Sequence, residues 1–384
     1  MISKKDEMHM KTRAITNMAS EKDEDAGRGD LELCRKDIDH IDARILSLLS
    51  ERLDAAAAIG RIKERLDMAV FDPVREKTIL DRMAKKSHGR LTPAAIRDIY
   101  TRIISAGRAV QGPLKVGFLG PEATFSHQAA ISIFGNSAEF CGFRTFEDVF
   151  GSVEKGHCNQ GVVPVENSLE GSVAGVWDLF NKFDLKICGE YYLRIRLSLM
   201  ARNRDINGIK KLYSHPMPLA QCRSWLKSHL PDVAFESVES TSLAAKMAAD
   251  DPSGAALGSR HLAETLGLSI LKEDIEDEPH NVTRFLAVGN SEPRPTGKDK
   301  TTLLFFLDHS PGALAGVLSA LSQREINVCR IESRPMPMRS WEYLFFVDLE
   351  GHREDPAMAD AMSEMETLCV FTKWLGSYPS GDVS

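Results

Sequence analysis

The sequence predicts three consecutive domains of different fold class: an all-α domain, a two-lobed α/β domain and a small α+β domain. Residues 31–112 place apolar side chains at helical spacing. Residues 113–290 alternate short apolar strands with helical patterns, and residues 301–376 follow the order strand, helix, strand, strand, helix, strand. A chain of 384 residues is long enough for two or three such domains.

The remaining segments are interpreted as tails and a linker. Residues 1–30 are polar and mixed in charge, so we expect a disordered tail there, or in part an overcalled start, because Met8, Met10 and Met18 could each initiate. Residues 291–300 contain the run Ser-Glu-Pro-Arg-Pro-Thr-Gly and are interpreted as a linker. Residues 377–384 are expected to form a C-terminal tail.

Composition and charge argue against several classes of function. A formal net charge of -7 argues against general nucleic-acid binding, and no apolar run reaches the roughly 18 residues needed to span a bilayer. The seven cysteines form no Cys-x-x-Cys pair, and no His or Cys cluster has the spacing of zinc ligands. We therefore expect a cytoplasmic protein with reduced thiols, no metal site and no cofactor.

Residues 31–66 predict one long helix. They contain no proline, Gly60 is their only glycine, and isoleucines recur at helical spacing. At about 1.5 Å per residue this helix would span roughly 50 Å, which is too long for the compact domain to cover by itself. An intertwined homodimer follows as a hypothesis.

Two cations of this helix, Arg52 and Lys63, fall within its apolar stripe. Arg52 lies seven residues from both Ile45 and Ile59, and eleven from Lys63, and both spacings return to nearly the same helical face. Because an unpaired buried cation is costly, acidic partners or an anionic ligand must neutralise these side chains. Structural salt bridging and ligand binding both remain open at this point.

Two shorter helices complete the first domain. The second begins at Asp72-Pro73, with Asp72 placed as the N-cap, and the third runs from Thr92-Pro93 to Gln111. Capping alone would explain Asp72. The whole segment resembles the all-helical bacterial chorismate mutase domain in the residues Arg35, Arg52, Lys63, Asp72, Arg75, Glu76 and Gln111.

That resemblance implies a site that binds a dicarboxylate in a folded conformation, because the rearrangement of chorismate to prephenate needs no nucleophile, acid or base. Arg35 of a partner subunit and Arg52 would bind the two carboxylates. Lys63 and Gln111 would face the ether oxygen. The ring hydroxyl and neighbouring polar groups would be anchored by Asp72 and Glu76, with Arg75 in the same cluster. Related domains often carry a small hydroxyl residue where this chain has Gly107, so one hydrogen bond is expected to be missing.

Five strand-to-helix junctions of the second domain carry small hydroxyl or amide residues, near residues 120–126, 166–171, 214–216, 240–242 and 258–260. Helix N-termini offer free N–H groups and the positive end of a dipole, so several of them converging on one cleft would bind carboxylates. Ordinary helix capping explains any single junction equally well. We expect two lobes joined by crossing strands, with the ligand between them.

The run Asn281 to Phe285 follows a cluster of acids and opens an apolar strand. A threonine hydroxyl followed by a guanidinium at a strand entrance suits a site that donates a proton and holds a carboxylate. The tripeptide Thr283-Arg284-Phe285 resembles the signature of prephenate dehydratases, as do residues 120–125, 161–168 and 214–223. The resemblance implies a fold similar to that of periplasmic binding proteins.

Membership of that family would make Thr283 the donor, or the positioner, of the proton that leaves with the ring hydroxyl of prephenate. Arg284 would bind a carboxylate or hold the loop. A threonine hydroxyl is a very weak acid, so we expect a hydrogen-bonded relay. His215 could supply the acid, but Ser214 and His215 could equally only shape a turn. The candidates for the relay are Thr124, Glu166, Asn167 and Ser168.

The third domain carries two motifs, residues 311–314 and 332–335, that look like the paired signatures of ACT domains, which bind phenylalanine at a dimer interface. Gly312 permits close approach of a ligand carboxylate to a helix N-terminus. Cys329 stands where the family favours serine or threonine. A dimerisation domain without a ligand is the alternative. The residues expected to bind the effector are Gly312, Ala313, Leu314, Asn327, Glu332, Ser333 and Arg334.

Together the three segments resemble the bifunctional chorismate mutase and prephenate dehydratase family of phenylalanine biosynthesis. This implies conversion of chorismate to prephenate and then to phenylpyruvate, with feedback inhibition by L-phenylalanine. Two alternatives stay open: the dehydratase half could prefer arogenate, or the chain could be a non-catalytic amino-acid sensor. A pure sensor would need neither Thr283 nor the cations Arg52 and Lys63, which argues against it.

Overall fold

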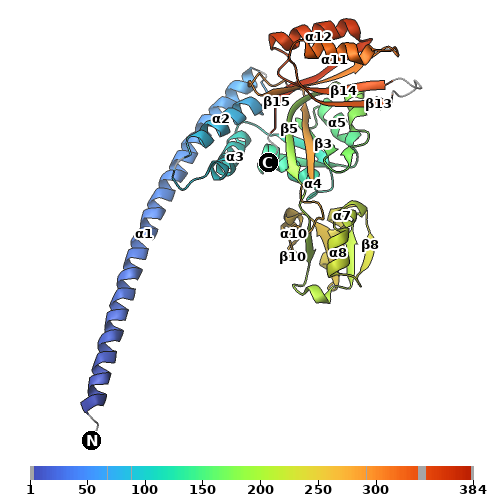
Figure 1. Ribbon diagram of the computed structural model, residues 1–384. Helices are drawn as coiled ribbons and strands as arrows, with labels where there is room; N and C mark the ends of the chain where they lie inside the picture. Colours follow the sequence, from blue (N-terminus) through green and yellow to red (C-terminus); the bar gives the residue numbers. More distant parts are fainter. Residues whose placement is uncertain (1–3, 67, 88, 291, 336–342, 382–384) are drawn as a thin grey trace.

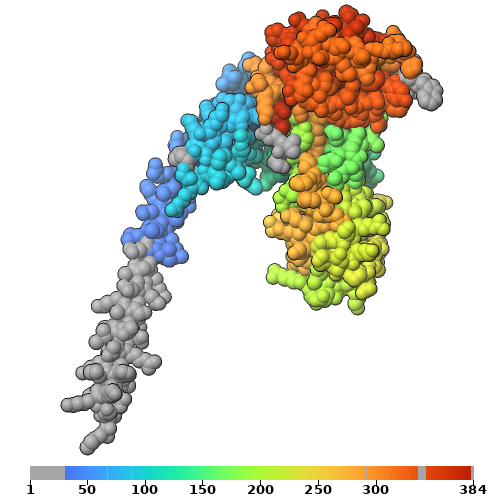
Figure 2. All heavy atoms as spheres, viewed as in Figure 1, coloured from blue at the N-terminus to red at the C-terminus, as the bar shows by residue number. Residues whose placement is uncertain are grey.

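The computed structural model describes residues 4–66, 68–87, 89–290, 292–335 and 343–381, with side chains from residue 31 onward. A long helix projects from a body in which the C-terminal domain caps one lobe of the α/β domain, with the second lobe at the opposite end (Figure 1). The space-filling view shows the short N-terminal helices packed beside this body (Figure 2).

The first domain consists of helices α1 (Lys4–Arg65), α2 (Pro73–Lys85) and α3 (Pro93–Ala109). The predicted caps are confirmed: Asp72 accepts a hydrogen bond from Arg75 N at 2.9 Å, and Thr92 accepts one from Ala95 N at 3.2 Å. Ile38, Ile41 and Ile45 on α1 remain 57%, 49% and 48% exposed in a single copy of the chain.

Helix α1 begins earlier than predicted. Residues 1–30 were expected to be disordered, but the helix starts at Lys4, and only residues 1–3 of that segment lie outside the described residues. The structure thus gives helix over residues 4–30, where the sequence predicted a disordered tail, and the predicted disorder stays a prediction. Residues 4–26 contain no proline or glycine and are rich in Lys, Glu, Met and Ala, so no local signal ends the helix.

The second domain has two lobes, as predicted. In the first, the sheet order is β2-β1-β3-β11-β5, with β4 paired to β3. Strand β1 is parallel to β2 and β3, whereas β11 is antiparallel to both β3 and β5. Its elements are β1 (Lys115–Leu119), α4 (Phe125–Phe134), β2 (Glu139–Phe143), α5 (Phe146–Glu154), β3 (Gln160–Asn167), β4 (Gly171–Ser172), α6 (Val176–Lys182), β5 (Lys186–Arg194) and β11 (Val282–Gly289).

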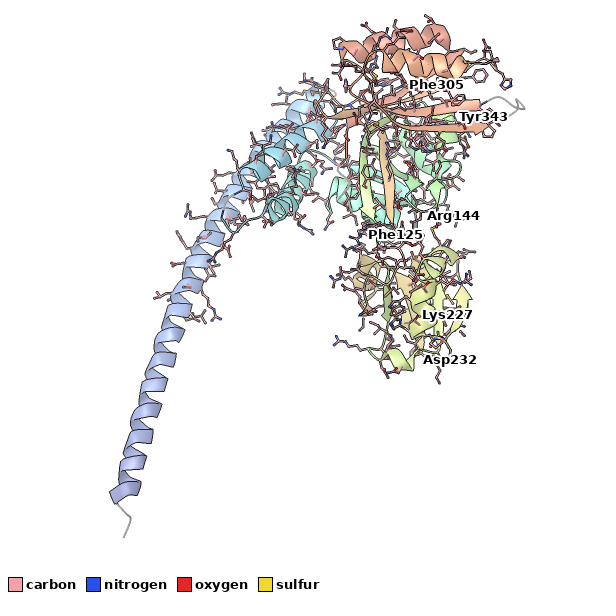
Figure 3. The ribbon with its side chains drawn as sticks, in the orientation of Figure 1. Phe125, Arg144, Lys227, Asp232, Phe305 and Tyr343 are labelled. Atoms are coloured by element: carbon pink, nitrogen blue, oxygen red, sulfur yellow. The ribbon has the colours of Figure 1, made fainter. Side chains whose placement is uncertain are left out.

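The second lobe has a five-stranded sheet in the order β10-β6-β9-β7-β8. The chain enters it after β5 and returns to the first lobe through β11, so two connections join the lobes. Phe125 lies where the lobes meet (Figure 3). The elements are β6 (Ser198–Ala201), the 3-10 turn η1 (Ile206–Gly208), β7 (Lys211–Ser214), α7 (Pro216–Gln221), α8 (Arg223–His229), β8 (Ala234–Ser237), α9 (Thr241–Asp250), β9 (Gly254–Gly258), α10 (Arg260–Leu266) and β10 (Ser269–Lys272).

The third domain has the predicted order βαββαβ, with an antiparallel sheet in the order β13-β14-β12-β15. Two predicted boundaries are wrong, because β12 starts inside the expected linker and β15 continues into the expected C-terminal tail, whose Gly381 N also donates to Glu190 Oε1 at 2.8 Å. Residues 382–384 and 291 lie outside the described residues. The elements are β12 (Asp299–Phe306), α11 (Ala313–Ser322), β13 (Val328–Pro335), β14 (Tyr343–Glu350), α12 (Pro356–Leu368) and β15 (Phe371–Pro379).

Apolar cores join the domains to one another. One face of the third domain's sheet packs under its own helices, and the other face packs on the first lobe, where the Trp177 and Phe346 ring centroids are 5.1 Å apart. Phe71 of the helical domain packs against Phe134 at the end of α4 at 4.7 Å. The first lobe is therefore the common support of the helical domain, the second lobe and the third domain.

None of the helices in the described part of the chain has both the length and the apolar character needed to cross a membrane. All seven cysteines are described, and none of them forms a disulfide bond.

Candidate active sites

The helical domain contains a cavity of about 300 Å³ whose polar lining comes from all three helices. The structure brings together here six of the seven residues that the sequence singled out for this domain: Arg52, Lys63, Asp72, Arg75, Glu76 and Gln111. The exception is Arg35, which is exposed on α1 and pairs with Glu32 at 2.9 Å. Its expected role in a partner's cavity stays a prediction.

The two cations of the apolar stripe are held by backbone carbonyls and not by acids. Arg52 Nη1 donates to Ile103 O at 3.2 Å, and Lys63 Nζ donates to Val70 O at 2.8 Å. Neither side chain forms an ion pair with any residue that the structure describes. Burial also lowers the pKa of Lys63. The salt-bridge alternative is therefore not supported, and an anionic ligand is the better explanation of these cations.

Gly107 leaves room for one of these cations. A Cβ atom on residue 107 would lie 2.8 Å from Nη1 of Arg52, so a serine at this position would displace the guanidinium. The Gly107 carbonyl also accepts a hydrogen bond from Gln111 Nε2 at 3.1 Å, which orients the amide. The position of Arg52 in this structure therefore depends on glycine at residue 107.

Sequence analysis missed one cation of this cavity, Arg108 at the end of α3. It is 4% exposed, and its Nε lies 3.0 Å from Glu76 Oε1. Burial raises the pKa of Glu76 to about 7, while Arg108 acts to lower it. The i, i+4 spacing from the buried Ile104 could have revealed that Arg108 faces the core.

The charges in this cavity suit a dianion. Four cations (Arg52, Lys63, Arg75 and Arg108) face two carboxyl groups (Asp72 and Glu76), which leaves an excess of two positive charges when both acids are ionised. Such an excess matches a dicarboxylate.

A second cavity of about 520 Å³ lies between the two lobes of the α/β domain. Thr124, Asn167, Thr283 and Phe285 line it from the first lobe, and His215 faces it from the second. Sequence analysis did not name several further lining residues individually as site residues, among them Glu170, Gln221, Ser240 and Thr241. Gln221 Nε2 donates to Glu170 Oε1 at 3.4 Å across the two lobes.

Thr283 is held by a neighbouring amide. Asn167 Nδ2 donates to Thr283 Oγ1 at 2.9 Å and to Asn281 Oδ1 at 2.7 Å. The other end of this amide is fixed as well, because Asn167 Oδ1 accepts from Leu169 N at 2.9 Å. Since the amide donates to the threonine oxygen, the hydroxyl hydrogen of Thr283 remains available to donate to a ligand.

Four of the five predicted junctions line this cavity, through Thr124, Asn167, His215 and Ser240. Thr124 and Ser240 cap α4 and α9 by accepting hydrogen bonds from His127 N at 3.4 Å and Leu243 N at 3.1 Å. His215 Nδ1 accepts from Met217 N at 3.2 Å, so the hydrogen of the neutral ring is on Nε2. Thr124, His215 and Ser240 therefore act as caps and also line the cleft.

Four predicted residues are not brought to Thr283. Neighbouring side chains of a strand point to opposite faces of the sheet, and the register pairs Thr283 with Asn167 but Arg284 with Glu166. Glu166, Ser168 and Arg284 consequently line a separate hollow on the other face. Ser214 is buried and donates to the carbonyl of His215 at 2.8 Å. The structure therefore does not bring these four residues to Thr283, and their predicted roles stay predictions.

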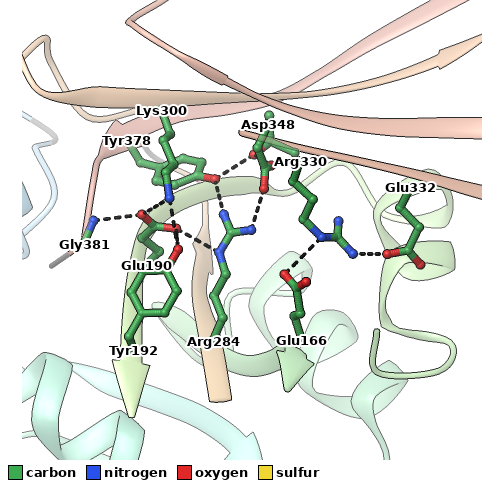
Figure 4. A network of polar contacts seen from close by, with 11 residues as sticks. Glu166, Glu190, Tyr192, Arg284, Lys300, Arg330, Glu332, Asp348, Tyr378 and Gly381 are labelled. Carbon is green, nitrogen blue, oxygen red and sulfur yellow. Dashed lines mark hydrogen bonds and ion pairs between the residues drawn. The ribbon is translucent and has the colours of Figure 1, made fainter. Parts of the chain in front are cut away.

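Arg284 instead belongs to a buried polar network between the first lobe and the third domain (Figure 4). Its Nε pairs with Glu190 Oε2 at 2.8 Å, its Nη1 pairs with Asp348, and its Nη2 donates to Tyr378 Oη at 3.0 Å. Burial alone would raise the pKa of Asp348, but Arg284 and Thr302 outweigh it and hold that pKa below its usual value. Of the two expected roles of Arg284, binding a carboxylate and holding the loop, these contacts favour the second.

The predicted effector residues are divided between two faces of the third domain. Gly312 precedes α11 with φ of 86°, a conformation that favours glycine, and Ala313 and Leu314 open that helix. Asn327 and Ser333 are exposed. Glu332 accepts a hydrogen bond from Ser172 at 2.6 Å, and Arg334 pairs with Asp178 at 3.1 Å, so these two residues contact the first lobe.

Comparison with known proteins agrees with the division of the chain into three domains. Family models match residues 34–112 as chorismate mutase type II, residues 116–293 as prephenate dehydratase and residues 301–366 as an ACT domain. The bifunctional chorismate mutase/prephenate dehydratase of Aquifex aeolicus is 43% identical over 354 residues, which cover 91% of this chain and 98% of that protein. The protein of the same description from Neisseria gonorrhoeae is 41% identical and covers 90% of this chain and 96% of its own length.

A solved structure is also similar. The prephenate dehydratase from Arthrobacter aurescens, in complex with L-Phe, superposes with a TM-score of 0.65 at 34% identity, covering 71% of this chain and 91% of its own. The relatives from Aquifex and Neisseria match all three domains in one polypeptide. The chain therefore belongs to the family of bifunctional chorismate mutase/prephenate dehydratases.

Proposed function

We propose that this chain carries out the two reactions of its family in two separate cavities. The helical cavity rearranges chorismate to prephenate, and the cleft between the lobes converts prephenate to phenylpyruvate. The observation that supports this most directly is that the predicted residues of each reaction meet in a different cavity: Arg52, Lys63 and Gln111 in one, Thr283 and Asn167 in the other.

The helical cavity acts on chorismate by holding it and stabilising charge. Rearrangement moves no proton and breaks and forms bonds only within the substrate, so rate enhancement must come from conformation and electrostatics. Arg52 and Arg35 of a second copy bind the two carboxylates, and Lys63 and Gln111 donate to the ether oxygen as negative charge develops there. Glu76 and Asp72 accept hydrogen bonds from the ring hydroxyl and adjacent polar groups.

The cleft acts on prephenate by assisting departure of the ring hydroxyl. The ring carboxylate leaves as CO2, its bonding electron pair enters the ring, and the hydroxyl leaves with a proton as water, so the products are phenylpyruvate, CO2 and water. Thr283, oriented by Asn167, donates a hydrogen bond to the departing oxygen. His215, with its hydrogen on Nε2, can donate a second hydrogen bond to the same oxygen, and the proton that leaves with the hydroxyl is supplied by solvent. The N-termini of α4 and α9 attract the remaining carboxylate.

L-Phenylalanine is the proposed effector at the third domain. Two of the contacts between this domain and the dehydratase strands lie close to the cleft: Glu332 with Ser172, which lines the cleft, and Asp348 with Arg284, the neighbour of Thr283. A shift of the third domain's sheet would therefore move β11, the strand that carries Thr283. The exposed isoleucines of α1 support a homodimer, in which a second copy would cover them and supply Arg35. A cytoplasmic location stays a prediction.

One assay tests the assignment. Purified protein is given chorismate, and chorismate, prephenate and phenylpyruvate are followed together, with and without L-phenylalanine. Phenylpyruvate that forms from chorismate and is suppressed by phenylalanine is the expected result. Accumulation of prephenate without phenylpyruvate would contradict the dehydratase assignment and favour arogenate as the substrate, and absence of any turnover would favour the sensor reading.

A further inference from the structure

Arg108 is a buried cation of the helical cavity that the resemblance to known mutase domains did not assign. Its Nε forms an ion pair with Glu76 Oε1 at 3.0 Å, and neither Nε nor Nη1 has a hydrogen-bond partner in the described part of the chain. The side chain lines the cavity together with Lys63 and Asp72. Burying an arginine is costly unless it is paired. The ion pair with Glu76, whose carboxylate also faces the cavity, offsets part of this cost.

Aromatic rings from two domains hold Arg108 on its other side. Its guanidinium carbon lies 5.2 Å from the ring centroid of Phe71 and 5.9 Å from that of Phe134 at the end of α4, both within the range of cation–π attraction. Ser105, one turn earlier on α3, donates to Phe134 O at 3.3 Å and accepts from Ser137 N at 3.2 Å. The first lobe of the α/β domain thus supports the end of α3 that carries Arg108.

We propose that Arg108 is a positioning residue for chorismate rearrangement: it holds the Glu76 carboxylate in the cavity and is itself supported by Phe134 of the dehydratase lobe. This inference rests on the proposed mutase function of the helical cavity. Glu76 accepts the hydrogen bond of the substrate's ring hydroxyl only when its carboxylate keeps this orientation and charge. The mutase site of this chain is therefore completed by packing against its dehydratase lobe.

The charges around Glu76 determine how loss of Arg108 would be detected. Burial raises the pKa of Glu76 to about 7. Arg108 from α3 and Lys63 from α1 act to lower it, and Asp72, before α2, acts to raise it, while Arg52 and Arg75 line the same cavity. Without Arg108 the pKa of Glu76 rises further, so a larger fraction of Glu76 is protonated and uncharged at neutral pH.

The test is Arg108→Met in the full-length chain, with mutase kcat/KM measured as a function of pH. We expect a loss of about 10- to 100-fold near neutral pH, the range typical of a lost contact between charged groups, and a shift of the acid limb to higher pH. Arg108→Lys should restore the pH profile in part. Turnover of prephenate by the same preparation verifies that the variant is folded.

The matched control is Arg97→Met. Arg97 also lies on α3 and also pairs with an acid of α2, Asp81, at 2.7 Å, but it does not line the cavity. Its replacement should leave mutase activity and the pH profile unchanged. Phe134→Leu, which keeps an apolar side chain but removes the ring, should lower mutase kcat/KM roughly 2- to 5-fold.

A double-mutant cycle decides whether Arg108 acts through Glu76. In a Glu76→Gln background, Arg108→Met should cause little further loss, because the group it positions is already gone. Additive losses, or a loss at all pH values without a shift of the acid limb, would overturn the proposal. Full mutase activity in Arg108→Met would overturn the role of Arg108 but leave the mutase assignment standing. A wild-type chain that fails to convert chorismate would instead overturn the mutase assignment.

Discussion

The two cavities of this chain present different groups to an anionic substrate. The helical cavity gathers four cationic side chains and positions two of them with backbone carbonyls. Among the described residues that line the cleft between the lobes there is no lysine or arginine, and helix N-termini and a hydroxyl group face the ligand space instead. A rearrangement needs stabilised charge, whereas a dehydration needs a proton donor, and the two linings differ accordingly.

The largest expected effect is on the dehydratase side of this comparison. Thr283→Ala removes the proposed hydrogen-bond donor and should lower prephenate turnover about 100- to 10,000-fold, the usual range for loss of a positioned proton-transfer group. Mutase activity and phenylalanine binding should be unchanged. Thr283→Ser keeps the hydroxyl and should retain much of the activity. Undiminished formation of phenylpyruvate by Thr283→Ala would refute the assigned role.

The corresponding change on the mutase side is Lys63→Met, which removes a cation but keeps an apolar stem of similar length. Mutase kcat should fall about 100- to 1,000-fold, as it does when a preorganised electrostatic contact is lost, while prephenate turnover stays intact. Lys77→Met is the matched control, since Lys77 pairs with Asp81 on the surface of α2 and does not line the cavity. Equal losses in both variants would show that the contact is not specific.

A third change tests stability at the contact between the third domain and the first lobe. Asp348→Asn breaks a buried pair with Arg284 and should lower the free energy of unfolding by about 3 kcal/mol, because an incompletely compensated charge remains buried. The pKa of Asp348 is held below its usual value, so the stabilisation is present above about pH 4 and is lost as the pH falls through the folded-state pKa. Denaturant unfolding of the wild type and the variant, at neutral pH and across acidic pH, measures the loss of stability and its pH dependence. An unchanged midpoint at neutral pH would contradict the prediction.

Among these four changes, the smallest effect is expected at Gly107. In Gly107→Ala the new methyl group would lie 2.8 Å from Nη1 of Arg52, and a flexible side chain can move away from it. Mutase kcat/KM should fall by roughly tenfold, less than the roughly 100-fold that a misplacement of about 1 Å can cost. Gly112→Ala is a suitable control, because its added methyl group would meet only Val70 at 3.4 Å. Steady-state kinetics of both variants on chorismate provide the comparison.

Local patterns in the sequence were sufficient for the order and class of the three domains, the caps at Asp72 and Thr92, and the convergence of Arg52 and Lys63 on one face. These features depend on helical periodicity and on side chains that bond within their own turn, so distant contacts are not required to predict them.

Long-range packing determined the features that the sequence analysis missed. Alternation along β11 requires Thr283 and Arg284 to face opposite ways, but which of them meets the cleft depends on the third domain covering the other face of the sheet, where Asp348 binds Arg284. Arg108 likewise meets Glu76 and Phe134 only because three segments distant in sequence pack together. Such pairings arise from the burial of surfaces contributed by separate domains, which no short stretch of sequence contains.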